Sequence, residues 1–80
     1  MEIEKYLNDL KPGSKGKIKK VDGQGNLKRR LLDMGILPGS PVEVIKLAPL
    51  GDPVDIKIKG YHLSLRKEEA KQISVIVEAL

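Results

Sequence analysis

The chain has 80 residues, a length that suits one domain, and a formal net charge of +4. It has no cysteine, so it can form neither a disulfide nor a thiolate metal site. No apolar run approaches the roughly 20 residues that span a bilayer, and the first residues alternate acids and bases without the apolar stretch of a secretory signal. Two tyrosines are the only aromatic residues, too few for a base-stacking platform or a groove that binds proline-rich peptides. We therefore expect a single cytoplasmic domain over residues 1–80 with no direct membrane insertion, basic enough to favour an acidic partner and too weakly charged to coat nucleic acid.

The first nine residues, MEIEKYLND, carry apolar side chains at helical spacing. Ile3, Tyr6, Leu7 and Leu10 lie at i, i+3, i+4 and i+7. This spacing predicts a short amphipathic turn of helix that covers one open end of the fold. The proline and glycine that follow Lys11 predict that a turn ends it.

Gly16–Val21, GKIKKV, predicts a strand decorated with lysines. Its apolar residues Ile18 and Val21 are three positions apart and so break the alternation expected of a strand. A bulge or a strong twist near Lys19 would reconcile them, and the lysines suit a strand at an edge of the sheet, where they discourage pairing with another chain. The link at residues 22–26 lacks the Gly-Lys-Ser/Thr of a phosphate loop, which favours a plain turn.

Residues 27–39, LKRRLLDMGILPG, predict a short helix with a cap at each end. Asn26 stands where an N-cap residue belongs, and Gly35 stands where a left-handed residue ends a helix. Pro38-Gly39 is typical of a turn, which we expect to lead into the next segment. We expect the apolar stripe of this helix to plug the core, and its other side to be basic. The stripe comprises Leu27, Leu31 and Met34, and the basic side comprises Lys28, Arg29 and Arg30.

The rest of the chain predicts a run of strands and turns. A proline-bounded loop follows the first of these strands, a two-residue Lys59-Gly60 turn follows the second, and a short helical segment over Arg66–Gln72 precedes the last. With Gly16–Val21 this makes five strands and one inserted helix, which predicts a mainly β fold with short helices, a small SH3-like barrel. The four predicted strands are Pro41–Leu47, Val54–Lys59, Tyr61–Leu65 and Ile73–Glu78.

No set of side chains is suited to catalysis, so we expect a non-enzyme. The chain has one histidine and no cysteine, and the paired carboxylates of residues 68–69 point in different directions on a helix. His62 is the only good ligand for a transition metal. It needs carboxylate neighbours or a second copy of the chain to build a site, and the other interpretation is an exposed strand histidine.

The cations gather in two clusters whose role the residues leave open. One comprises residues 28–30 and the other residues 66–67. They are either two solvated helix faces or a docking surface for an acidic partner.

Residues 30–36, RLLDMGI, followed by Pro38-Gly39, resemble the pattern R-L-x-x-[ML]-G-[FIL]-x-x-G of the ferrous iron transport protein A (FeoA) family of small SH3-like proteins. The likeness runs from about Leu10 to Val77. Its further matches are Pro49, Gly51-Asp52-Pro53, Val54-Asp55-Ile56, Gly60-Tyr61, Leu63, Leu65-Arg66, Ala70 and Ile73-Ser74-Val75. Structural motif positions implied by the resemblance are Leu31, Met34, Gly35, Gly39, Pro53 and Gly60.

The resemblance implies an accessory or regulatory role in bacterial ferrous iron uptake. Members of the family are thought to act on the membrane transporter FeoB, whose cytosolic part is a GTPase. For this role we expect the two basic clusters to bind the partner, through Lys28, Arg29, Arg30, Arg66 and Lys67. A GTPase-activating role calls for an exposed arginine, for which Arg29, Arg30 and Arg66 are the candidates.

Two alternatives stand beside this role. The first is a metal-responsive module, similar to the C-terminal domains of iron-dependent repressors, that binds Fe²⁺, Mn²⁺ or another divalent transition metal at His62. The second is nucleic-acid binding through the two basic clusters, which predicts a steep salt dependence of affinity. We rank the FeoB-associated role first, the metal-responsive module second and nucleic-acid binding last.

Overall fold

The computed structural model describes residues 2–22 and 25–78. Its strands are β1 (Glu2–Tyr6), β2 (Lys15–Val21), β3 (Pro41–Leu47), β4 (Val54–Ile58), β5 (Tyr61–Leu65) and β6 (Ile73–Glu78). Its helices are α1 (Asn26–Asp33) and α2 (Lys67–Ala70), with single 3-10 turns at η1 (Leu7–Asp9) and η2 (Pro49–Gly51). None of the helices within the described ranges is both long and apolar enough to cross a bilayer.

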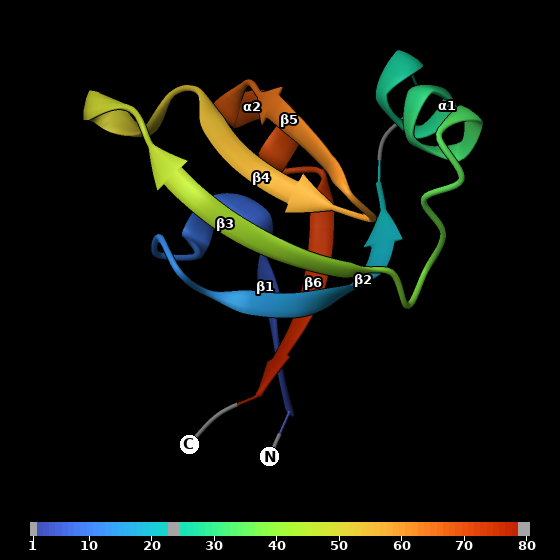
Figure 1. The fold of residues 1–80 in the computed structure, drawn as a ribbon, viewed down its shortest axis with the longest axis horizontal. Helices are drawn as coiled ribbons and strands as arrows, with labels where there is room; N and C mark the ends of the chain where they lie inside the picture. The colour runs from blue at the N-terminus through green and yellow to red at the C-terminus, as the bar shows by residue number, and fades with distance from the viewer. Residues whose placement is uncertain (1, 23–24, 79–80) are drawn as a thin grey trace.

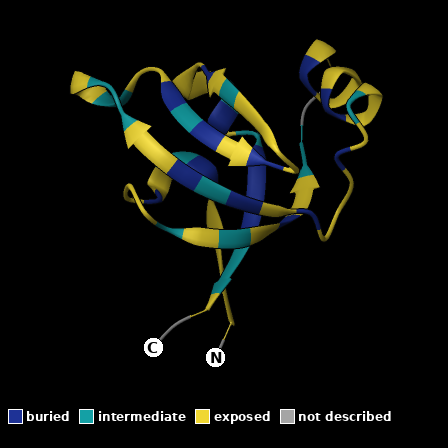
Figure 2. Cartoon of the chain, viewed as in Figure 1, coloured by how far each residue is buried: buried dark blue, intermediate teal, exposed yellow. Residues whose placement is uncertain are grey.

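The six strands form one antiparallel sheet in the order β1-β6-β2-β3-β4-β5 that curls around a single apolar core (Figure 1). Alternation along β4 buries Val54, Ile56 and Ile58, and Figure 2 shows further buried positions along β3 and β6. The mainly β class with short helices is therefore confirmed. The predicted bounds of β3, β5 and β6 match the structure. Tyr61 alternates with Leu63 and Leu65, which predicts that its side chain faces the core, but it is about half exposed.

The N-terminal prediction of a helix is wrong for its first part. Residues 2–6 form β1, which pairs with β6 from Glu2 opposite Glu78 to Tyr6 opposite Ser74. Burial of side chains does not select this conformation, because all five β1 residues are exposed. It is selected by backbone hydrogen bonding to β6, a strand that is distant in sequence. The sheet consequently has six strands where the sequence predicted five. Helical geometry begins only at Leu7, whose side chain is fully buried.

β2 carries the predicted bulge, and its predicted position at an edge is wrong. The register of β2 against β6 shifts between Ile18 and Lys20, which buries Ile18 in the core. β2 lies between β6 and β3 in the interior of the sheet. Its lysines reach water because they occupy the outer face, where Lys19 Nζ lies 2.8 Å from Glu4 Oε1 of β1.

α1 begins one residue earlier than predicted. Asn26 is its first residue, Gly25 is the N-cap, and no side chain of the described residues caps the N-terminus. Glycine is itself accepted at an N-cap, so the asparagine is free to enter the helix. Leu27 and Leu31 are buried as predicted. Met34 was predicted in the core and is only partly buried, because it is the C-cap residue at the rim of the packing.

The C-terminus of α1 ends in the predicted left-handed glycine. Gly35 has φ +78°, its N–H donates to the Leu32 carbonyl at 2.9 Å, and the Ile36 N–H donates to the Leu31 carbonyl at 2.9 Å. These two bonds form a Schellman motif, which satisfies carbonyls that the last turn leaves without partners. The Lys59-Gly60 turn between β4 and β5 is confirmed as well, with positive φ at both residues.

We expect Gly35→Ala to lower the free energy of unfolding by about 1–2 kcal/mol. The nearest atom to an added Cβ would be Lys59 Nζ at 3.9 Å, so the loss comes from the left-handed backbone and not from a clash. Urea denaturation measures it. Gly35→Asn is the control, since asparagine tolerates this conformation better, and an equal loss in both variants would contradict the backbone explanation.

Candidate functional site

α1 stands at the side of the barrel, joined to β2 and β3 by short links (Figure 1). Besides its buried leucines, two polar contacts hold it and the turn after it. Arg30 Nη2 lies 3.3 Å from Glu69 Oε2 on α2, and Lys59 Nζ donates to the Gly35 carbonyl at 2.9 Å. The helix is therefore attached along one side and keeps a long exposed face.

The predicted partner-binding residues are five exposed cations on two helices: Lys28, Arg29 and Arg30 on α1, and Arg66 and Lys67 at the start of α2. We call these five residues the basic surface. Glu69 connects its two parts, because its Oε1 accepts the Arg66 backbone N–H at 2.9 Å while its Oε2 pairs with Arg30. The structure thus brings together two clusters that lie far apart in sequence.

The five cations are not equally available. Arg30 is held by Glu69, although the pair is exposed enough that it contributes little to stability. Lys28, Arg29 and Lys67 form no ion pair within residues 2–22 and 25–78. Of the arginines predicted as candidates for contact with a nucleotide, Arg29 is the one on α1 left without a carboxylate partner there.

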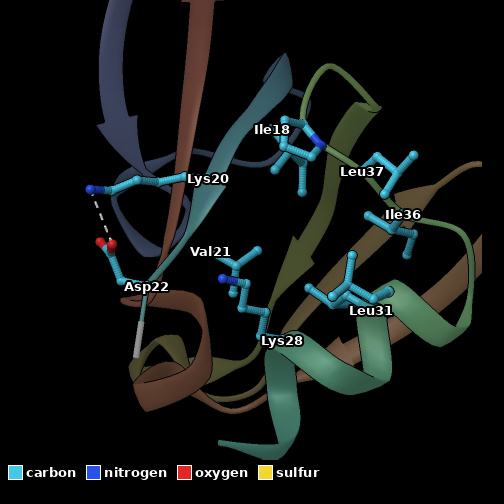
Figure 3. A pocket seen from close by; sticks show the side chains of 10 residues that line it. Ile18, Lys20, Val21, Asp22, Lys28, Leu31, Ile36 and Leu37 are labelled. Atoms are coloured by element: carbon cyan, nitrogen blue, oxygen red, sulfur yellow. Dashed lines mark ion pairs between the residues drawn. The ribbon is translucent and has the colours of Figure 1, made fainter. Parts of the chain in front are cut away.

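An apolar cleft of about 280 Å³ lies between α1, β2 and the loop after α1 (Figure 3). Ile18 and Val21 of β2 point toward Leu31 of α1, and Ile36 and Leu37 close the loop side. The cleft adjoins the basic surface, because Lys28 also lines it. It is a pre-formed space whose lining includes one of the five predicted docking residues, Lys28.

Sequence reasoning did not identify this cleft. Leu32 and Leu37 are 47% and 53% exposed and both line it. The sequence contained one signal of it, two leucines outside the buried stripe of α1. Leu32 lies on the polar side of the helix, and Leu37 lies beyond the helix, next to Pro38. Large apolar residues at such positions indicate a surface that something else covers.

His62 lies on the exposed face of β5, opposite Lys57 of β4. Asp55 and Ser64 are nearby in a shallow hollow, and the Ser64 hydroxyl donates to the Asp55 carboxylate. Across the described residues, no group of three or more histidines, cysteines or carboxylates is placed to hold a metal ion. Metal binding at His62 therefore stays a prediction from sequence.

The other predicted motif positions lie in turns. Gly39 has φ +94° in the loop before β3, Gly60 has φ +84° in the hairpin turn, and Pro53 follows a cis peptide bond before β4. These positions shape the connections that end or begin strands.

Comparison with known proteins identifies relatives over most of the chain. The model of the FeoA domain family matches residues 5–77. A fusion protein of Fe(2+) transport protein A and Fe(2+) transporter FeoB from Porphyromonas gingivalis is 41% identical over 69 residues. That match covers 86% of this chain and 8% of the fusion protein, so the chain spans a small part of that relative.

Solved structures agree with the family match. A FeoA protein from Chlorobium tepidum superposes with a TM-score of 0.85 at 35% identity, over 94% of this chain and 71% of that one. FeoA from Stenotrophomonas maltophilia, a prokaryotic SH3 domain protein determined in complex with zinc, superposes with a TM-score of 0.76 at 27% identity, over 89% and 88%. The predicted SH3-like fold is thereby confirmed.

Proposed function

The chain belongs to the FeoA domain family, and from this premise we propose that it is a cytoplasmic accessory protein of ferrous iron uptake that binds the cytosolic GTPase part of FeoB and modulates transport. The family is linked to ferrous iron transport. The observation that carries the proposal is the fusion relative, in which an FeoA part and an FeoB part share one polypeptide. A covalent link keeps two domains at high effective concentration, which is useful when they work on each other.

The basic surface supplies the electrostatic part of this contact. Lys28 and Arg29 project from α1 without carboxylate partners in the described ranges, and the whole chain carries a net charge of +4. Complementary charge raises the rate of encounter and orients the partner, more than it adds raw affinity. The partner face for this surface is therefore acidic.

The proposed role is positioning, with no catalysis by the chain itself. A binding protein modulates a GTPase by favouring one of its conformations, to the extent that it binds that conformation more tightly. Arg29 and Arg66 are the candidates to reach phosphate charge in such a complex, because Arg30 is engaged with Glu69 whereas the other two form no ion pair within residues 2–22 and 25–78.

A titration of the ¹⁵N-labelled chain with the nucleotide-loaded cytosolic domain of the FeoB from the same genome tests this proposal. Resonances of α1 and of the turn after it should shift, and the double variant Lys28→Glu/Arg29→Glu should bind about tenfold more weakly at low salt. The difference should shrink as salt is raised, because exposed charges are screened.

The control is Lys11→Glu, a single charge reversal of the same kind in the segment between η1 and β2, on the opposite side of the barrel from α1 (Figure 1). It should bind like the wild type. If no resonance shifts at high micromolar concentrations of the FeoB domain, the proposed function is wrong. If the control variant and the double variant bind equally weakly, the basic surface does not make the contact.

A further inference from the structure

The cleft beside α1 leaves apolar side chains uncovered on the surface of a small domain. Leu31 and Ile36 form its floor and are buried, while Leu32 and Leu37 stand about half exposed at its edge. Its volume of about 280 Å³ lies just below the roughly 300–1,000 Å³ of pockets that take small molecules. The space therefore suits one or two side chains better than a cofactor.

The loop wall of this cleft is held rigidly by hydrogen bonds. The Leu37 N–H donates to Ser40 Oγ at 3.0 Å, and the Ser40 N–H donates back to the Leu37 carbonyl at 3.0 Å. Across to β2, the Gly39 N–H donates to the Ile18 carbonyl at 2.7 Å, and the Ile18 N–H donates to the Ser40 carbonyl at 2.9 Å. A pre-ordered wall loses little conformational entropy when a partner binds, which favours recognition at this place.

The charge at the rim selects the chemistry of the occupant. Lys20 is paired with Asp22 at 3.2 Å, whereas Lys28 reaches from α1 toward Val21 and has no carboxylate partner among residues 2–22 and 25–78 (Figure 3). One unpaired ammonium over an apolar floor matches a carboxylate next to an apolar side chain. A phosphate group would call for several converging donors, and of the two lysines that line this cleft only Lys28 has no ion-pair partner within residues 2–22 and 25–78.

We propose that this cleft receives an aliphatic side chain from an acidic segment of the partner protein, with the flanking carboxylate paired to Lys28. The inference rests on the proposed function and deepens it, since it makes the cleft the anchor and the basic surface the guide. Binding energy in interfaces concentrates at a few side chains that fill pockets, while surrounding charges contribute orientation.

The test measures the dissociation constant of the FeoB cytosolic domain for the full chain and three leucine variants. Leu37→Ser and Leu32→Ser should each weaken binding about tenfold or more, while preserving the fold because both side chains are half exposed. Leu50→Ser is the matched control, since Leu50 is 96% exposed in η2. It should change the dissociation constant less than twofold.

Each outcome decides between the cleft and the broader proposal. Binding that is equal in all four proteins would overturn the cleft and leave partner binding intact. If the wild type does not bind the FeoB domain, the proposed function fails. A second probe then tests whether the cleft accepts an aliphatic side chain next to a carboxylate. That probe is a short synthetic peptide with one leucine between glutamates, compared with the same peptide carrying lysines.

The peptide experiment reads out methyl resonances of the ¹³C-labelled chain. Shifts of Ile18, Leu31 and Leu37 with the glutamate peptide, and weaker ones with the lysine peptide, would support the cleft as the acidic-segment site. Equal shifts with both peptides, or none, would overturn it. Cleft shifts that change on dilution of the chain alone, with a matching change in sedimentation, would identify a second copy as the occupant instead.

Discussion

Leu31→Ala is expected to lower the free energy of unfolding by about 3 kcal/mol, and so to remove a large part of the stability of a domain this small. Leu31 is 1% exposed and projects from α1 into the core against strands far away in sequence. The substitution removes buried methyl groups and leaves a void that the hydrogen-bonded loop after α1 cannot close. Urea denaturation with an unchanged m-value would measure this loss as a change of native stability.

The neighbouring residue provides the control for this experiment. Leu32→Ala makes the same chemical change one position along α1, where the side chain is 47% exposed, and should cost less than about 1 kcal/mol. The two variants should separate by function as well, because Leu32→Ala keeps the fold and removes an edge of the cleft. Equal losses of stability would mean that α1 does not insert Leu31 as the structure places it.

The parts of the fold that sequence predicted are those that neighbouring residues determine. Alternation of apolar and polar residues located β4, and the positive φ that Gly35 adopts is required by the end of α1 itself. Such local rules agree with the tertiary structure here, so the predictions hold. The bulge in β2 followed in the same way from the spacing of Ile18 and Val21.

β1 shows where local rules fail. The apolar residues from Ile3 to Leu10 fit helical spacing, yet only Leu7 and Leu10 are buried, and residues 2–6 are a strand. The deciding interaction is the backbone ladder with β6, more than sixty residues away in sequence. Pairing of this kind leaves no mark in a window of ten residues.

The candidate site was predicted only in part for the same reason. The basic residues of α1 were visible in the sequence, but the pairing of Arg30 with Glu69 joins positions 39 residues apart. The cleft likewise exists only where Ile18, Leu31 and Leu37 meet. Sequence thus identified the charges that we propose to steer a partner, whereas the cleft proposed to receive the partner's side chain appears only in three dimensions.

Gly16→Ala is expected to destabilise the sheet by about 2–3 kcal/mol, because two strands approach at Gly16 too closely for any side chain. A Cβ there would lie 2.6 Å from the Ile76 carbonyl oxygen and 2.9 Å from Val77 Cγ1. The carbonyl belongs to the backbone of β6, so relief requires β2 and β6 to move apart. This is steric strain and is independent of the φ angle at Gly16.

Thermal unfolding should place the midpoint of Gly16→Ala about 10–20 °C below that of the wild type. Lys17→Ala, at the exposed neighbouring position on β2, is the control and should stay within about 0.5 kcal/mol of the wild type. Hydrogen exchange should quicken most between β2 and β6 and least between β4 and β5. If Gly16→Ala melts like Lys17→Ala, the close approach of β2 to β6 is wrong, and with it the placement of β2 in the interior of the sheet.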